Sequence, residues 1–384
     1  MPIQELLKEL SQATGVSGHE EPVRRIVRRE FEKYADEVVT TRLGSVIACK
    51  RATAPRANSH NGRGAAAHKL LIEGHMDEIG LLVTAIDRGF IRFTEIGGYD
   101  VRILPSQSVV VHGRTELPGV IGARPPHVLS ADERGRAVPL SELFIDVGLP
   151  DARVRELVTV GDVITLDRQV VSLRNNLLAG KAFDDRAAVV SVIDALRQLQ
   201  GVSLAWDIYA VANVQEEDGA WFVGAFTSTY QVHPDVAVAL DVSHADQPGI
   251  GDVNVVPLDK GPGIALGPNI HPRVHARLVK TAETHEIPHR ITAYPGPTGT
   301  DAWAIQVVAE GIPTGLVDLP LRYMHTSVET VAVNDLERTA RLLAAFAGSL
   351  DDEFYREVKG TETVQTSRAP QTTGRTAKKS RKHG

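Results

Sequence analysis

Two adjacent glutamates, Glu216 and Glu217, stand at the end of the apolar run DIYAVANVQ, and the chain breaks at Gly219 soon after them. Successive side chains of a strand point to opposite faces, so this pair alone could mark only a strand that reaches water. Acids and histidines stand at comparable places elsewhere, after predicted strands or just before a predicted helix. The full candidate set is His75, Asp77, Asp184, Asp185, Glu216, Glu217, Asp241 and His325.

Ligand sites of open α/β sheets form beyond the carboxyl ends of the strands, where we expect this set to meet. Each member has an ordinary explanation: Asp184 or Asp185 could cap the following helix, and Asp241 could open a turn. Together they would concentrate negative charge, which a pair of divalent cations would balance. Imidazole and carboxylate ligands without cysteine suit Zn²⁺, Co²⁺ or Mn²⁺. One glutamate of the adjacent pair could then bind metal while the other carries protons for an activated water.

Alternating helices and strands after residue 180 are expected to position these side chains. DDRAAVVSVIDALRQLQ and NDLERTARLLAAFAGSL have helical spacing, whereas LAWDIYAVANVQ, DVAVALDV and PTGLVDLP are typical of strands. The alternation predicts an α/β fold with a mostly parallel sheet and helices on both faces. A strand of the same sheet, KLLIEG, comes before a long stretch of short apolar segments punctuated by Gly and Pro, which is typical of a small all-β barrel or sandwich.

We therefore predict a catalytic α/β domain in two parts, residues 1–81 and 176–355. A small all-β domain, PDZ-like or a barrel, is inserted at residues 82–175. It contributes none of the candidate ligands, so we expect it to serve oligomerisation. Residues 51–69 lack periodicity and predict a mobile insertion. Residues 356–384 predict a disordered basic tail.

The composition restricts the class of protein. The chain has 384 residues, 42% of them hydrophobic and 23% charged, as in a globular protein without membrane spans. The start, MPIQELLKELSQATG, lacks the apolar stretch of a secretory signal. The single cysteine, Cys49, fits a reducing cytoplasm. Residues 360–384 carry six Lys and Arg against one acid, so the rest of the chain has a net charge of −11, which argues against nucleic acid as the main ligand.

Several motifs together resemble one metallopeptidase family. They are GHMDEIG, GGYDVRILPSQ, LFIDVG, KAFDDR, VQEEDG, LDVSHADQPG, KGPGI, GPTGTDA and RYMHTSVET, spread over roughly residues 4–350. In this order they resemble the tetrahedral, dodecameric aminopeptidases, also called glutamyl or deblocking aminopeptidases. The resemblance implies that the catalytic α/β domain is zinc-peptidase-like. Some members of that family carry a cellulase or endoglucanase name. The sequence departs from the family pattern at Asp218, where a hydrophobic residue is usual, and in GAWFVGA, which is about two residues longer.

The resemblance implies two divalent metal ions per subunit, zinc or cobalt and less readily manganese. It implies that His75 and Asp241 each bind one metal and that Asp184 bridges the two ions. Glu217 and His325 are the implied ligands of the second metal.

The resemblance also assigns roles outside the metal ligands. It implies that Glu216 is the general base and that Asp77 orients the imidazole two residues before it. Asp185 and Arg186 complete the DDR motif and are expected to shape the loop. The peptide bond between the two aspartates of that motif is cis in related enzymes.

The implied function is metal-assisted removal of N-terminal residues from peptides by a homo-oligomer, a dodecamer built from dimers. GTDA (299–302) and KGPGI (260–264) are expected either to line the cleft or to form tight turns. Three alternatives stay open. One is another dinuclear amidohydrolase, such as a carboxypeptidase or deacylase. The others are a glycoside hydrolase, which would use paired carboxylates without metal, and a non-enzymatic scaffold.

Overall fold

The computed structural model describes residues 1–54, 67–218, 221–251 and 254–360. Most of the predicted mobile insertion (51–69) and of the predicted disordered tail (356–384) lies outside these ranges. Helix α10 (Asp352–Lys359) includes residues 356–359, which the sequence assigned to the tail. That boundary is corrected, because Phe354 and Val358 are buried and anchor this last helix. In the described part of the chain, no helix is long and apolar enough to cross a bilayer.

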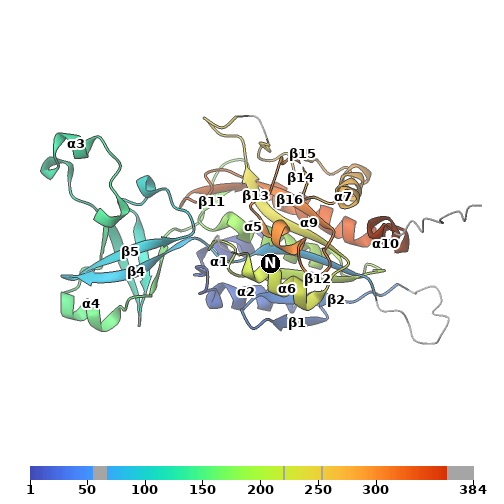
Figure 1. The fold of residues 1–384 in the computed structure, drawn as a ribbon, viewed down its shortest axis with the longest axis horizontal. Coiled ribbons are helices and arrows are strands. Elements are labelled where there is room, and N and C mark those ends of the chain that lie inside the picture. The colour runs from blue at the N-terminus through green and yellow to red at the C-terminus, as the bar shows by residue number, and fades with distance from the viewer. Residues whose placement is uncertain (55–66, 219–220, 252–253, 361–384) are drawn as a thin grey trace, which may run out of the picture.

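The centre of the α/β part is an eight-stranded mixed sheet with the order β1-β2-β12-β3-β13-β16-β14-β15 (Figure 1). The strands are β1 (Glu37–Thr40), β2 (Val46–Lys50), β12 (Asp207–Asn213), β3 (Lys69–His75), β13 (Val236–His244), β16 (Thr314–Leu321), β14 (Gly263–Leu266) and β15 (Arg290–Ala293). The four middle strands, β12, β3, β13 and β16, are parallel to one another. Strands β1, β2 and β14 pair antiparallel with their inner neighbours. The predicted α/β class is confirmed, and the parallel pairing dominates at the centre.

Helices cover both faces of this sheet. One apolar cluster packs the sheet against α1 (Ile3–Gln12), α2 (Glu21–Phe31), α5 (Phe183–Gln198), α7 (Pro272–Thr284), α9 (Val333–Gly348) and α10. The other packs it against α6 (Val223–Val232) and α8 (Asp301–Ile305). Strands buried on both faces become almost continuously apolar, which is why β13 and β16 carry so few polar residues. The polar residues that do occur in these strands therefore need a specific role.

A closed antiparallel barrel lies to one side of the α/β part (Figure 1). Its strands are, in order around the barrel, β4 (Gly80–Asp87), β5 (Phe90–Ile96), β8 (Phe144–Asp146), β7 (Glu116–Gly122), β6 (Ser108–His112) and β9 (Val163–Leu166). It has an apolar core of its own, separate from the two clusters of the sheet. The barrel also carries α3 (Ala131–Arg134), α4 (Asp151–Leu157) and the 3₁₀ turns η1 (Val101–Ile103), η2 (Pro126–Val128) and η3 (Leu140–Glu142).

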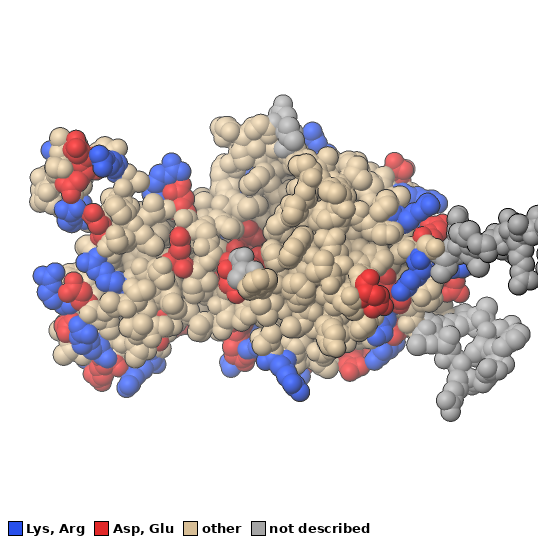
Figure 2. All heavy atoms as spheres, in the orientation of Figure 1, with Lys and Arg blue, Asp and Glu red and all other residues tan. Residues whose placement is uncertain are grey.

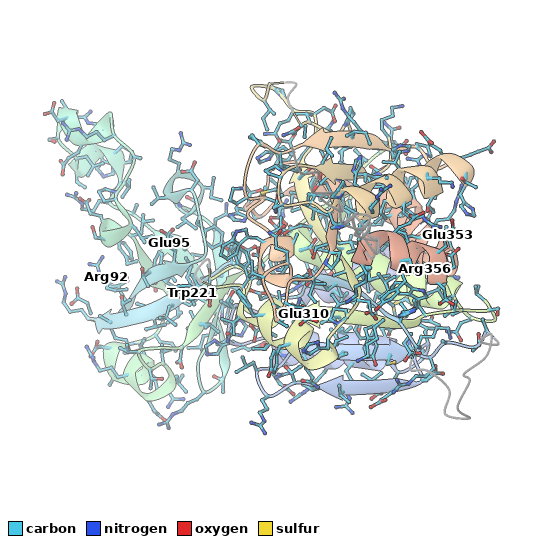
Figure 3. The ribbon with its side chains drawn as sticks, turned by 45° about the vertical axis from the view of Figure 1, so that its right-hand side comes forward. Arg92, Glu95, Trp221, Glu310, Glu353 and Arg356 are labelled. Atoms are coloured by element: carbon cyan, nitrogen blue, oxygen red, sulfur yellow. The ribbon has the colours of Figure 1, made fainter. Side chains whose placement is uncertain are left out.

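Along the chain, the barrel strands come after β3 and before the later strands of the α/β part, as expected of an inserted domain. Figure 3 marks this arrangement: Arg92 and Glu95 lie on β5, whereas Glu353 and Arg356 lie on α10 at the other end of the molecule. Strands β10 (Val171–Ser172) and β11 (Leu177–Gly180) follow the barrel in the chain and form a small sheet with β17 (Glu329–Ala332). Strand β11 leads directly into α5, which carries the DDR motif.

Candidate metal centre

The candidate residues come from five segments that converge at one edge of the sheet. His75 is the last residue of β3, and Asp241 lies inside β13 near its end. Glu216 and Glu217 follow β12, and His325 follows β16. Because β12, β3, β13 and β16 are parallel, their carboxyl ends lie at the same edge.

Asp184 reaches this edge from the irregular start of α5. Asp184 and Asp185 both have non-helical backbone angles, and the peptide bond between them is cis. The bond geometry is the one that the family resemblance implies. Both side chains are buried.

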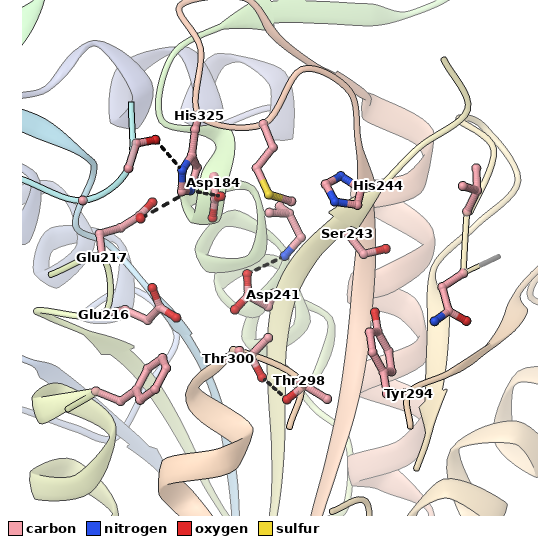
Figure 4. Close-up of a pocket in the computed structure, with 18 of the residues that line it drawn as sticks. Asp184, Glu216, Glu217, Asp241, Ser243, His244, Tyr294, Thr298, Thr300 and His325 are labelled. Carbon is pink, nitrogen blue, oxygen red and sulfur yellow. Dashed lines mark hydrogen bonds and ion pairs between the residues drawn. The ribbon is translucent and has the colours of Figure 1, made fainter. Parts of the chain in front are cut away.

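Two groups of ligand atoms share Asp184 (Figure 4). In one group the atoms of His75, Asp184 and Asp241 lie within 4.8 Å of one another, and in the other those of Asp184, Glu217 and His325 do. Nε2 of His75 is 3.3 Å from Oδ1 of Asp184, and Nε2 of His325 is 3.4 Å from its Oδ2. The two oxygens of one carboxylate thus face the two groups. Each group could hold a metal ion, with Asp184 between them.

Glu216 belongs to neither group. Its Oε2 is 3.8 Å from Nε2 of His75, and its side chain faces the pocket beside Glu217 (Figure 4). The two adjacent glutamates therefore differ in their partners, since Glu217 approaches His325 to 3.4 Å and Glu216 does not.

Asp77 contacts both the His75 imidazole and the backbone of the glutamate pair. Its Oδ1 lies 3.4 Å from Nδ1 of His75, opposite the ring nitrogen that faces Asp184. Its carboxylate also accepts hydrogen bonds from the backbone N–H groups of Glu216, at 3.1 Å, and Glu217, at 3.0 Å. The hydroxyl of Ser17 donates to it at 2.5 Å. One buried carboxylate therefore lies against the His75 imidazole and fixes the turn that carries the glutamate pair.

Glu329 has a positioning role that sequence reasoning missed. Its buried carboxylate accepts hydrogen bonds from the backbone N–H groups of Phe183 at 2.7 Å, Asp184 at 3.2 Å and His325 at 2.9 Å. It therefore joins two segments that are distant in the chain. Burial first, and then the charge of Asp184, raises the pKa of Glu329 to about 8. The residue lies in the RYMHTSVET motif, but its spacing from His325 fits no ligand pattern that would have revealed the role.

The barrel segment also reaches the site. The backbone carbonyl of Gly98 lies 2.9 Å from Nδ1 of His325. A carbonyl oxygen only accepts, so Nδ1 donates this bond, and in the neutral ring Nε2 keeps its lone pair toward Asp184 and Glu217. At Gly97, with φ of 77°, a Cβ would come within 2.4 Å of Ile79 and 3.1 Å of the Glu217 carbonyl. The GGYD motif thus allows a close approach that we had not predicted, since we expected this insertion to stay outside the chemistry.

Arg186 and Asp185 organise the surrounding backbone. The fully buried guanidinium of Arg186 donates to the carbonyls of Leu10, Ala13 and Met76 and to the carboxylate of Glu78. Asp185 accepts a hydrogen bond from the backbone N–H of His75 at 3.3 Å. Neither belongs to a ligand group. These contacts agree with the expectation that the two residues shape the loops.

The cluster concentrates buried negative charge that a bound cation would balance. Burial raises the pKa values of Glu216, Glu217 and Asp241 well above the ordinary values, and neighbouring carboxylates raise them further. Burial by itself would lower the pKa of His75, but carboxylates led by Glu216 raise it well above its usual value. For Asp184, burial opposes ionisation, yet the imidazoles of His325 and His75, when protonated, bring its pKa below the usual range. Among the described residues that line the pocket there is no Lys or Arg. Oxygen and nitrogen donors with unbalanced negative charge fit divalent metal ions.

A pocket of about 730 Å³ opens beside this cluster. We call one part of its lining the far wall, which consists of Ser243, His244, Ile250, Val255, Tyr294 and Thr298. Figure 4 shows Ser243, His244 and Tyr294 on the side opposite Glu216 and Glu217. Phe222, from the GAWFVGA segment, also lines the pocket.

The two glycine-rich motifs have different places. Gly299 and Thr300 line the pocket, which is the first of the two expectations stated for GTDA. Residues 260–264 do not line it. Instead, the N–H of Gly261 donates to Asp335 at 2.7 Å, and Gly263 begins β14. The expectation that KGPGI lines the cleft is therefore wrong, because this segment enters the sheet.

Comparison with known proteins agrees with this fold and this cluster. The M42 glutamyl aminopeptidase family matches residues 58–342. A lysyl aminopeptidase of Pyrococcus furiosus is 34% identical over 352 residues, which cover 90% of this chain and 97% of that protein. The structure of an aminopeptidase from the archaeon Desulfurococcus kamchatkensis has a TM-score of 0.84 at 36% identity, covering 94% of this chain and 98% of that one.

A further solved structure adds an assembled relative. The Pyrococcus horikoshii TET1 peptidase, which can assemble into a tetrahedron or a large octahedral shell, has a TM-score of 0.77 at 31% identity and covers 91% of this chain and 100% of that one. By sequence, by fold and by its cluster of histidines and carboxylates, this chain belongs to the M42 glutamyl aminopeptidase family, whose members are hydrolases that act on peptide bonds.

Proposed function

We propose that this chain removes N-terminal residues from peptides at a dinuclear metal centre, with Glu216 as general base. The observation that carries the proposal is the pair of ligand groups that share Asp184, with Glu216 beside them and in neither. His75, Asp184 and Asp241 would hold one ion, and Asp184, Glu217 and His325 the other. Zinc or cobalt suits these donors, and manganese is a further choice. When bound, such ions supply Lewis acidity toward a water and a peptide carbonyl.

The protein's own groups handle protons and positioning. Glu216 takes the proton from the attacking water and later gives it to the amine that leaves. Asp77 keeps the imidazole of His75 in one orientation and fixes the backbone of Glu216. The Gly98 carbonyl does the same for the imidazole of His325. A free peptide N-terminus is positively charged, and the acidic pocket is complementary to it.

Two alternatives make different demands on the substrate. A deacylase or carboxypeptidase would act when the peptide N-terminus is blocked, whereas an aminopeptidase needs the free amine. A glycoside hydrolase would keep working without metal. Membership of the M42 family favours the aminopeptidase.

The test compares leucyl-p-nitroanilide, its N-acetyl form and a cello-oligosaccharide. Each is offered to the purified protein, to the chelated protein and to protein reloaded with Zn²⁺, Co²⁺ or Mn²⁺. We expect hydrolysis of the free-amine compound only, loss on chelation and recovery on reloading. Hydrolysis of the acetylated compound at a similar rate, or undiminished activity after complete metal removal, would reject the proposal.

We further propose that the protein works as a closed homo-oligomer, a dodecamer built from dimers, in the cytoplasm. The tetrahedral assembly of the Pyrococcus horikoshii relative supports this proposal. Enclosed active sites would admit short peptides and exclude folded proteins. Cys49 is buried and has no second cysteine to pair with, as suits a reducing compartment.

A further inference from the structure

Asp77 is a buried carboxylate that contacts several parts of the proposed site. Figure 2 shows acidic side chains gathered in the middle of one face, where the barrel meets the α/β part. Asp77 is not among these surface groups, because its side chain is fully buried. Its Oδ2 atom accepts hydrogen bonds from the backbone N–H groups of Glu216 and Glu217, and its Oδ1 atom lies 3.4 Å from Nδ1 of His75. The orientation of this one carboxylate therefore affects the proposed base and two proposed metal ligands.

The hydroxyl of Ser17 makes the shortest of the contacts to that carboxylate. It donates to Oδ2 of Asp77 at 2.5 Å, whereas the N–H groups of Glu216 and Glu217 donate to the same oxygen at 3.1 and 3.0 Å. Ser17 is itself buried, so bulk water competes little for this bond. A hydrogen bond to an ionised group is also stronger than one between neutral groups. The hydroxyl therefore limits the rotation of the Asp77 carboxylate.

Backbone contacts hold Ser17 beside the segment that carries Asp77. Val16 forms a parallel bridge with Glu78, the residue after Asp77. The N–H of Ser17 donates to the Glu78 carbonyl at 3.3 Å. Gly80 permits this close approach, since a Cβ there would lie 2.5 Å from a methyl carbon of Val16. The serine thus stands opposite Asp77 because the two backbones pair.

The turn after Ser17 is fixed as well. The N–H of Gly18 donates to the carboxylate of Glu20 at 2.6 Å, and Glu20 is the residue before α2. Glu20 is buried, and α2 packs its apolar side into the core of the α/β part. A shift of the backbone at Ser17 would therefore disturb the packing of a helix. The hydroxyl is thus presented to Asp77 from a backbone that is held on both sides.

We propose that Ser17 is a positioning residue of the catalytic site, whose hydroxyl holds Asp77 in the orientation that fixes the turn of Glu216 and Glu217. The inference rests on the proposed aminopeptidase function and deepens it, because it makes the connection between α1 and α2 part of the site. Ser17 belongs to neither ligand group and does not line the pocket. It acts through Asp77.

Ser17→Ala removes the hydroxyl and little volume. With the metal-loaded protein, we expect kcat to fall about 10- to 100-fold, because Glu216 is less well placed to take a proton. KM should stay within about twofold of the wild-type value, since no substrate contact is lost. The dissociation constant for Zn²⁺, measured by chelator competition, should rise about tenfold, because Glu217 and His75 are less well fixed. That second measurement does not depend on turnover.

A matched control separates this effect from the general cost of deleting a buried hydroxyl. Ser191 is fully buried in α5, and its hydroxyl donates to the Ala187 carbonyl at 3.0 Å. Ser191→Ala should lower the melting temperature, as any lost buried hydrogen bond does. It should leave kcat and the Zn²⁺ dissociation constant near their wild-type values.

A second pair of variants isolates the hydroxyl from the size of the side chain. Ser17→Thr keeps the hydroxyl, whereas Ser17→Val has nearly the same shape without it. The kcat of Ser17→Thr should exceed that of Ser17→Val by about tenfold or more. If Ser17→Ala fails to fold, this pair carries the test.

A double-mutant cycle tests whether Ser17 acts through Asp77. Once Asp77→Ala has removed the acceptor, adding Ser17→Ala should change the Zn²⁺ dissociation constant by less than about twofold. The cycle uses metal affinity, so it can be completed even where Asp77→Ala has little activity. Full additivity of the two changes would overturn the inference.

The failure of the inference and the failure of the proposed function are distinguishable. If the wild-type protein neither binds Zn²⁺ nor hydrolyses leucyl-p-nitroanilide, the proposed function itself fails. If it does both, and Ser17→Ala matches Ser191→Ala in kcat and in Zn²⁺ affinity, the inference alone is overturned. Equal kcat values for Ser17→Thr and Ser17→Val would also overturn it.

Discussion

At the residue scale, neighbouring carboxylates can do different work because their contacts differ. Glu217 approaches His325, whereas Glu216 stands nearest His75 and outside both ligand groups. We predict that Glu216→Gln keeps its metals and loses about 10³-fold or more in kcat, because the amide cannot exchange a proton. Metal analysis and kcat on one sample check this. Glu95→Gln, an exposed change of the same chemistry on the barrel, is the control. Turnover near the wild-type value in Glu216→Gln would refute the role.

The shared position of Asp184 gives a second prediction at this scale. Its two oxygens face two different histidines, so Asp184→Ala should deplete both ions. His75→Ala and His325→Ala should each weaken mainly one site. Equilibrium dialysis followed by metal analysis gives the number of ions per subunit for all three variants. Two full equivalents in Asp184→Ala would exclude a bridging role.

The sequence singled out the histidines and carboxylates that meet in the two ligand groups, but not the residues whose contacts involve the backbone. His75, Asp184 and Asp241 lie in motifs where the residue type itself indicates a ligand. Glu329 acts by accepting three backbone N–H groups, and Gly98 acts through its carbonyl. Such contacts depend on where distant segments meet, and residue type and spacing do not encode that.

At the element scale, the strongly periodic segments were predictable and the short ones were not. The two-sided burial of β13 and β16 leaves a clear apolar signature. Strand β14 follows Gly and Pro and has only four residues, so its sequence indicates a turn. It becomes a strand because it pairs parallel with β15 and antiparallel with β16. The antiparallel borders of the sheet have the same origin, since pairing partners are set by tertiary contacts.

Asp318, which lies in β16 beside this border of the sheet, should make the stability of the protein depend on pH. Burial raises the pKa of Asp318 to about 6, although hydrogen bonds from Thr292 and Tyr294 oppose the shift. The folded state therefore binds a proton more tightly than the unfolded state, in which the pKa has its ordinary value. Stability from this residue is present at low pH and is lost as the pH rises through about 6. Relative to Asp318→Asn, which stays neutral, the wild type should gain about 1.4 kcal/mol of unfolding free energy when the pH falls from about 8 to about 5.

Urea unfolding of both proteins at several pH values measures this difference. Comparing the two proteins cancels the pH dependence that they share, including the dissociation of metal at low pH. A wild type that loses stability relative to Asp318→Asn on acidification would contradict the sign. Equal behaviour over the whole range would mean that the pKa of Asp318 is not raised.

At the scale of the whole molecule, the barrel has the independence expected of a contact module. It has its own core, and its closure leaves no free strand edge among the described strands. A closed barrel can therefore meet a neighbour through side chains rather than through strand edges. Side chains remain available, since Phe90, Val120, Val128 and Val160 are exposed apolar residues of this segment. The Gly98 contact to His325 adds that displacing the barrel would disturb the proposed second metal site.

The last prediction concerns assembly and the tail. Helix α10 ends at Lys359 and is anchored by Phe354, whose side chain is fully buried. Truncation after residue 359 keeps this anchor and removes only the polar basic segment. We expect the truncated protein to retain a large closed oligomer in light scattering and to hydrolyse short peptides without attacking folded proteins. Truncation after residue 350, which removes α10, is the contrasting variant and should lower the melting temperature by exposing the apolar surface that Phe354 covers. Dissociation on loss of residues 360–384 would assign assembly to the tail. A strictly monomeric enzyme with full peptidase activity would show that enclosure plays no part, while the two-metal chemistry could still hold.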